Sequence, residues 1–130
     1  MSIYLIVSIV IGHFVGDWIC QSREMAEKKI ENLWILLLHV LTANSVLFVF
    51  VLASTQFFSI ENNVVFCAIV FCVLLSVLHF IQDLVLWSIY HDARGLSYND
   101  HKQDKIFFNT IALDQIIHLS ITMIIANWLF

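Results

Sequence analysis

The chain has 130 residues, of which 61% are hydrophobic and only 12% are charged, and its formal net charge is −4. This composition excludes an ordinary soluble globular domain, and the length suits one domain. We therefore expect a single integral membrane domain over residues 1–130, in contact with membrane lipid and without a nucleic-acid partner.

Four apolar segments are each long enough for a membrane-spanning helix, which needs about 20 residues. They cover residues 3–22, 33–54, 63–90 and 107–130 approximately. The chain has no proline, so each segment can form an unbroken helix that satisfies its backbone groups in lipid. The predicted fold class is all-α, a bundle of four transmembrane helices.

The six basic residues all lie in two connections, residues 21–32 and 91–105. The positive-inside rule places both connections in the cytoplasm and both termini outside. Six acids share these connections, so the net charge belongs to Glu61 and to three aspartates within predicted helices: Asp17, Asp83 and Asp114. A carboxylate in the middle of a spanning helix costs on the order of 3 kcal/mol. These aspartates therefore require a compensating cation or protons.

A short sequence repeat links the first and third predicted helices. HFVGD at residues 13–17 recurs as HFIQD at residues 79–83, each near the cytoplasmic end of its helix. Because these two helices run in the same direction, the similarity indicates two helical hairpins related as a parallel repeat.

Polar residues occur at similar depth in all four predicted helices. At 1.5 Å per residue, they lie roughly 8–18 Å from the cytoplasmic helix ends. Three His/Asp pairs are spaced i, i+4, so each pair shares one helix face. We predict one polar layer with seven members: His13, Asp17, His39, His79, Asp83, Asp114 and His118.

These imidazoles and carboxylates are suitable ligands for one or two divalent transition-metal ions. Nitrogen and oxygen donors without an evident thiolate favour Zn²⁺, Mn²⁺ or Fe. Asp17, Asp83 or Asp114 could instead serve as a general base toward a water bound by the metal. Gln21 and Gln115 are predicted to orient ligands or substrate.

Basic residues near the cytoplasmic helix ends suggest a phosphate-bearing or lipid-like substrate. Lys28, Lys29 and Lys102 are predicted to neutralise a phosphate or a lipid headgroup. The alternative is that these lysines only set the topology. The four tryptophans near helix ends are predicted to anchor the protein at the membrane interfaces: Trp18, Trp34, Trp87 and Trp128.

The favoured function is a membrane-embedded metal-dependent hydrolase that cleaves a phosphoryl or ester bond of an amphipathic substrate at the cytoplasmic leaflet. One alternative is a proton-coupled transporter or ion channel, in which a homodimer uses the same side chains. Another is an interaction protein, for which Gly12 and Gly16 offer a small-residue pair. A fourth is that the polar residues only hold the helices together, at about 0.6 kcal/mol per contact.

The combined motifs resemble those of an uncharacterised family of small bacterial and phage integral membrane proteins, a domain of unknown function. The resemblance rests on two His-Phe-x-x-Asp motifs, the lone His39, a Met-Ala-x-x-Lys stretch from Met25, and Asp-Gln-x-x-His from Asp114. It covers nearly the whole chain. It implies a location in the bacterial inner membrane and supplies no activity.

Overall fold

The computed structural model describes residues 2–22, 25, 28–29, 31–57, 63–95 and 100–130, with the side chains of 55–57, 92–95 and 100–104 outside the description. The helices are α1 (Ile3–Phe14), η1 (Val15–Ile19), α3 (Leu33–Phe57), α4 (Val64–Gly95) and α5 (Asp100–Leu129). No strand occurs in these residues. The predicted all-α bundle is confirmed.

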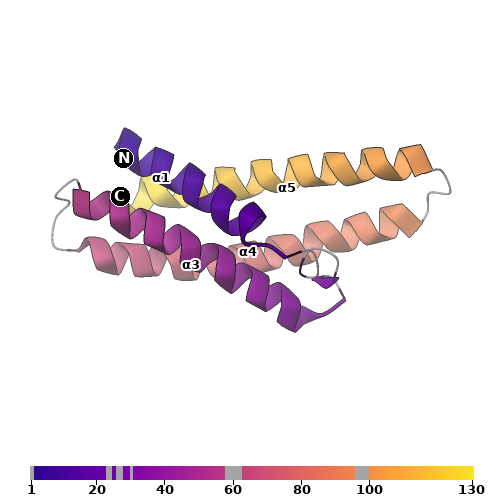
Figure 1. Ribbon diagram of the computed structural model, residues 1–130, viewed down its shortest axis with the longest axis horizontal. Helices are drawn as coiled ribbons and strands as arrows, with labels where there is room; N and C mark the ends of the chain where they lie inside the picture. The colour runs from indigo at the N-terminus through magenta and orange to yellow at the C-terminus, as the bar shows by residue number, and fades with distance from the viewer. Residues whose placement is uncertain (1, 23–24, 26–27, 30, 58–62, 96–99) are drawn as a thin grey trace.

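The helices alternate in direction along the bundle (Figure 1). α1 and α4 run one way and α3 and α5 run back, so the N- and C-termini lie at the same end. α1 packs against α3 and α5, and α4 packs against α3 and α5. This is the arrangement expected when consecutive segments cross a membrane in turn. The parallel repeat of two hairpins stays a prediction, although α1 and α4 have the common direction that it requires.

Three helices are long and apolar enough to cross a membrane, over Leu33–Ser54, Val64–His91 and Lys105–Leu129. The first apolar helix is shorter than predicted and covers Ile3–Ile19. Its last turn is a π-turn, closed by a 2.9 Å hydrogen bond from the Cys20 amide to the Val15 carbonyl. The other helices extend past their apolar segments, since polar residues outside lipid can continue a helix.

Side-chain caps explain where two helices begin. The Ser2 hydroxyl accepts a 3.2 Å hydrogen bond from the Leu5 amide at the start of α1. The Asn32 carboxamide oxygen accepts a 2.9 Å hydrogen bond from the Trp34 amide at the start of α3. Both satisfy amide groups that have no partner within the first helical turn.

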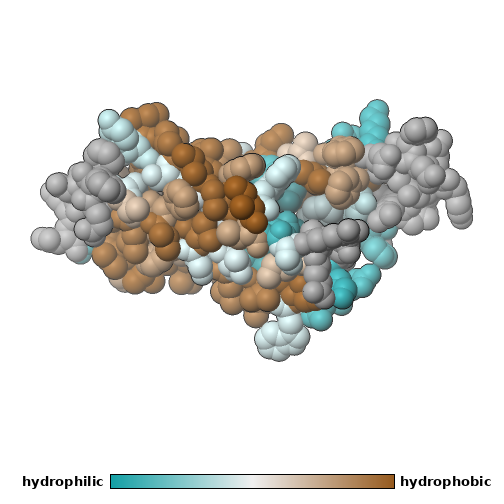
Figure 2. All heavy atoms as spheres, viewed as in Figure 1, coloured by the Kyte–Doolittle hydropathy of each residue, from teal (hydrophilic) through white to brown (hydrophobic). Residues whose placement is uncertain are grey.

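An apolar core fills the end of the bundle that holds the termini. Its buried members are Leu5, Ile9, Leu47, Val51, Ala68, Phe71, Leu75 and Ala126. Hydrophobic side chains also cover much of the visible outer surface toward that end, while hydrophilic residues gather toward the other end (Figure 2). Apolar residues both inside and outside are what a bundle surrounded by lipid requires.

Two glycines allow α1 and η1 to approach α3 closely. A Cβ atom on Gly16 would lie 2.5 Å from the Ala43 carbonyl oxygen, and one on Gly12 would lie 2.8 Å from the Phe50 Cβ. The small-residue pair is therefore used inside the bundle. This contact positions η1, and with it Asp17, against α3.

Gly16→Ala is expected to lower the free energy of unfolding by about 1–3 kcal/mol, because its methyl group would meet main-chain atoms that cannot move aside easily. Thermal unfolding in detergent, followed by circular dichroism, measures the effect. Ser45→Ala, at an exposed position of α3, is the matched control. Equal stability of the two variants would contradict the close contact.

Candidate metal centre

The structure buries the whole predicted polar layer, and none of its seven residues is more than 9% exposed. Ion-pair contacts link six of them across η1, α3, α4 and α5: Asp17, His39, His79, Asp83, Asp114 and His118. Four segments distant in sequence thus meet at one level of the bundle. The geometry agrees with the depth expected from helix rise.

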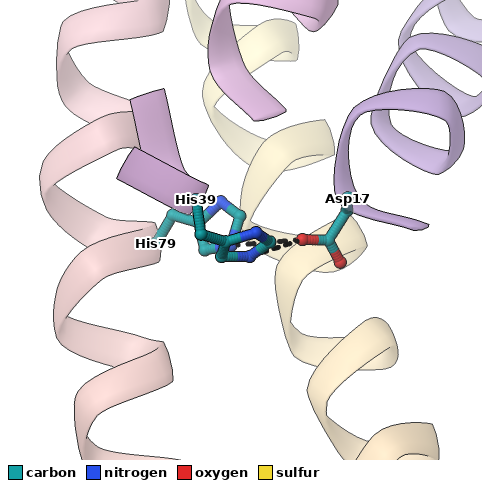
Figure 3. A group of neighbouring side chains, drawn as sticks. All are labelled: Asp17, His39 and His79. Carbon is teal, nitrogen blue, oxygen red and sulfur yellow. Dashed lines mark ion pairs between the residues drawn. The ribbon is translucent and has the colours of Figure 1, made fainter. Parts of the chain in front are cut away.

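Asp17, His39 and His79 form the first group of potential metal ligands, with one donor atom from each lying within 4.8 Å of the others. Asp17 Oδ1 lies 3.1 Å from His39 Nε2 and 3.4 Å from His79 Nε2. In Figure 3 the two imidazole rings, from α3 and α4, approach the carboxylate that η1 provides.

The second group shares His79 and adds Asp83 and His118. Asp83 Oδ1 lies 3.7 Å from His79 Nε2 and 3.4 Å from His118 Nε2. Asp83 Oδ2 lies 3.5 Å from His39 Nε2, so the two groups are continuous. Because one imidazole nitrogen binds one ion at a time, His79 can complete only one of the groups at once.

Asp17 lies in the π-turn that ends the first apolar helix. Its Oδ1 atom contacts His39 on α3 and His79 on α4. Turns of this kind are frequent at functional sites.

The spacing of the donor atoms fits a bound cation. Four ligands placed about 2.0–2.1 Å from one ion, as for Zn²⁺, lie about 3.3–3.4 Å from one another in a tetrahedron. The nitrogen-to-oxygen separations in the two groups are 3.1–3.7 Å. The Nε2 atoms of His39, His79 and His118 and Oδ1 of Asp83 are buried, and none has a hydrogen-bond partner among the described residues. A cation in the first group would satisfy the Nε2 atoms of His39 and His79, and a cation in the second group would satisfy the Nε2 atoms of His79 and His118 and Oδ1 of Asp83.

The tautomer of His118 strengthens this interpretation. His118 Nδ1 lies 3.0 Å from the main-chain carbonyl oxygen of Asp114, which only accepts hydrogen bonds, so Nδ1 holds a proton. In the neutral ring, Nε2 then presents its lone pair, 3.4 Å from the carboxylate oxygen Asp83 Oδ1. Two electron-rich atoms facing each other require a positive partner, which is either a proton or a metal ion.

Lys29 belongs to the buried cluster, a position that the sequence did not predict. Its ammonium donates a 2.8 Å hydrogen bond to Asp83 Oδ2 and lies 4.7 Å from the centre of the Trp87 ring. The side chains of Lys29 and Asp83 are 5% and 1% exposed. Three aspartates and one ammonium leave two negative charges when the histidines are neutral, and one divalent cation would cancel them.

Two glutamines hold the carboxylate-bearing segments in place. Gln115 donates a 2.7 Å hydrogen bond from Nε2 to Asp17 Oδ2, which leaves Asp17 Oδ1 facing the histidines. Gln82 donates a 3.2 Å hydrogen bond to the Asp114 main-chain oxygen. Gln115 thus has the orienting position that the sequence suggested, whereas Gln82 was not predicted.

A pocket of about 320 Å³ lies directly beside the cluster. Its lining includes the site residues Asp17, Lys29, Asp114 and Gln115. Gln21 also lines it, with a buried Nε2 atom that has no hydrogen-bond partner in the described part of the chain. The pocket gives a small molecule access to the buried carboxylates.

The remaining predicted site residues lie elsewhere. His13 is buried behind the cluster, with its ring 5.9 Å from that of His118, and it belongs to neither ligand group. Lys28 is exposed. The side chain of Lys102 lies outside the described residues. Lys29, predicted at the mouth of the layer together with these lysines, is part of the buried cluster.

One of the predicted interfacial tryptophans is not an exposed anchor. Trp18, Trp34 and Trp128 are 51%, 78% and 79% exposed, as an interfacial position requires, but Trp87 is only 9% exposed. It packs against Lys29, Tyr90 and Phe107 beside the pocket. The anchor prediction is therefore wrong for Trp87, because Lys29 lies over its ring and two aromatic residues pack against it.

The fold and this site define a class of protein, a small helical bundle compatible with a multi-pass membrane protein and containing a buried histidine–aspartate cluster. Within it, the chain belongs to the family described as "Protein of unknown function (DUF3307)", which matches residues 5–130. This confirms the resemblance to an uncharacterised family. No curated protein and no solved structure matches the chain.

Proposed function

We propose that this protein is a membrane-embedded, metal-dependent hydrolase of the bacterial inner membrane. Its substrate is amphipathic and contains the phosphoryl or ester bond that is cleaved at the cytoplasmic leaflet. Residues 21–32 and 91–105 face the cytoplasm in this proposal, because they hold all six basic residues. The observation that supports it best is that Asp17 belongs both to a ligand group and to the lining of the pocket.

One divalent ion, Zn²⁺, Mn²⁺ or Fe²⁺, is assigned to Asp17, His39 and His79. Asp83 is the weaker candidate ligand because Lys29 already neutralises it, and a second cation beside that ammonium would be repelled. Among the residues that the structure describes, no ammonium or guanidinium group pairs with Asp17, and Gln115 leaves one of its oxygens available. Three protein ligands with an open position are typical of catalytic rather than structural metal sites.

The metal supplies Lewis acidity and lowers the pKa of a water molecule toward about 7. Asp114 is assigned as the general base, since it lines the pocket and contacts His118 at 3.1 Å. It takes one proton from the attacking water while the water oxygen bonds to phosphorus or to the ester carbon. The bond to the leaving alcohol then breaks, and the same proton passes to the alkoxide, so one water is consumed.

A transport path is less well supported. Beyond His13, the buried polar side chains Asn44, Ser54 and Thr122 each donate to a main-chain oxygen of their own helix. The buried hydrophobic residues around them, among them Ile9, Leu47 and Phe71, form the apolar core. A proton or ion pathway requires polar groups or water along its length. A site that opens at one end and is closed by apolar packing at the other favours an enzyme.

The proposal predicts metal-dependent cleavage of a chromogenic alkyl p-nitrophenyl phosphodiester or ester by the purified protein in detergent. Asp17→Asn is expected to lower kcat/KM by about 100-fold or more, because it removes a charged ligand of the metal. Glu31→Gln, at an exposed position, is the control for loss of one acid. Cleavage that is insensitive to chelators, or equal in both variants, would refute the proposal.

A further inference from the structure

Several hydrogen-bond donors surround the pocket beside the metal centre. The Lys29 ammonium has three N–H donors, one of which reaches Asp83 Oδ2. Trp87 Nε1 and Gln21 Nε2 are buried donors without a hydrogen-bond partner in the described part of the chain. A buried donor left unpaired costs about 1–3 kcal/mol. Three donor-bearing side chains that line one pocket indicate an acceptor-rich, anionic ligand.

Another part of the pocket lining is apolar. Trp18, Phe107 and Ile111 contribute apolar surface to the pocket. Trp18 and Phe107 are also 51% and 37% exposed, so this surface continues to the outside of the bundle. A volume of about 320 Å³ holds a headgroup-sized fragment rather than a whole lipid. The rest of an amphiphile would lie along these exposed aromatic residues.

The charges of the site favour a particular kind of anion. Within the described cluster, one divalent ion and Lys29 together balance the three aspartates, and a proton between His118 and Asp83 would leave one positive charge. Asp114, which also lines the pocket and has no cation assigned to it, would repel a dianion more than a monoanion. A phosphate monoester has close to two negative charges near neutral pH, whereas a phosphodiester has one. A singly charged group with several acceptor oxygens suits these donors best.

We infer that the pocket binds the phosphodiester group of an amphiphile, with Lys29, Trp87 and Gln21 donating to its phosphate oxygens and Trp18 and Phe107 contacting its apolar part. This inference rests on the proposed function, because it assigns a substrate class to the same site. It adds binding roles for Trp87 and Gln21, and it selects a phosphodiester over a monoester and a carboxylic ester.

Isothermal titration calorimetry of the metal-loaded protein in detergent tests this assignment. The titrants are dihexanoyl phosphatidylglycerol, dihexanoyl phosphatidic acid and dimethyl phosphate, and the lipid recovered afterwards is checked for cleavage. We expect the phosphatidylglycerol to bind about tenfold more tightly than the other two titrants, a difference of about 1.4 kcal/mol. Tighter binding of phosphatidic acid would overturn the charge argument. If dimethyl phosphate binds as tightly as the phosphatidylglycerol, the ligand is a soluble phosphodiester, and the amphiphile assignment is overturned.

Single substitutions test whether the Trp87 N–H group and the Lys29 ammonium donate to the phosphate. Trp87→Phe keeps an aromatic ring but removes the N–H group, and we expect binding about fivefold to tenfold weaker; Lys29→Gln is expected to weaken it more. Trp34→Phe and Lys105→Gln make the same chemical changes at exposed positions and should bind within about twofold of the unaltered protein. Wild-type affinity in Trp87→Phe, the variant that leaves the Lys29–Asp83 pair in place, would overturn the donor assignment.

The metal content of each sample separates this inference from the proposed function. A protein that contains metal but binds no phosphodiester would refute the inference and leave the metal site standing. A metal-free protein whose phosphodiester binding depends on Trp87 would support the pocket assignment and refute the metalloenzyme.

Discussion

His79→Ala is expected to raise the apparent dissociation constant for Zn²⁺ or Mn²⁺ by about 100-fold or more. His79 belongs to both ligand groups, so its loss leaves neither group complete. Even changes to residues that only orient a ligand typically cost 10–100-fold in metal affinity, and removal of a ligand should reach at least the upper end of that range. Competition with a chromophoric chelator measures the constant.

Two other histidines provide matched controls for this experiment. His91→Ala changes an exposed histidine on the same helix, and His13→Ala changes a buried one outside the ligand groups. Both should keep an affinity within about tenfold of the unaltered protein. His79→Gln tests the same loss with less change in side-chain volume. Equal losses in all four variants would show that the effect is on folding and not on ligation.

Lys29→Met is expected to lower the free energy of unfolding by about 3–5 kcal/mol. The substitution leaves the Asp83 carboxylate buried without the ammonium that lies 2.8 Å away, and breaking one side of a buried ion pair typically costs this much. The double variant Lys29→Met/Asp83→Asn should recover a large part of the loss, because it removes the unpaired charge. Unfolding in mixed micelles, followed by circular dichroism, gives both values.

The stabilities of Lys29→Met, of Asp83→Asn and of the double variant together give the coupling energy between the two side chains. If the two substitutions were simply additive, Lys29 and Asp83 would contribute independently and the buried pair would not exist in the membrane. Lys105→Met, at an exposed lysine on α5, should change stability by less than about 0.5 kcal/mol.

The sequence predicted the helices and the depth of the polar layer because both follow from regular geometry. A helix rises by a fixed distance per residue, so His39 on one helix and Asp83 on another could be placed at the same level from their distances to the helix ends. The two atoms that meet there, His39 Nε2 and Asp83 Oδ2, are 3.5 Å apart. Helix periodicity and helix rise were sufficient for this part of the site.

Two features of the site were not predicted, the π-turn at Val15–Ile19 and the burial of Lys29. Nothing in VGDWI distinguishes a π-turn from an α-helix, so the turn that contains Asp17 was not predicted. Lys29 lies in a charged connection, where an exposed lysine is the usual expectation. Its burial depends on Asp83 and Trp87, which are more than 50 residues away in sequence.

The metal content of the unaltered protein tests the metal centre most directly. It is measured by elemental analysis against chain concentration, on protein purified from membranes without added chelator. We expect close to one Zn, Mn or Fe ion per chain. A folded, helical protein that contains none of them, and takes up none when Zn²⁺, Mn²⁺ or Fe²⁺ is supplied, would contradict the metal centre.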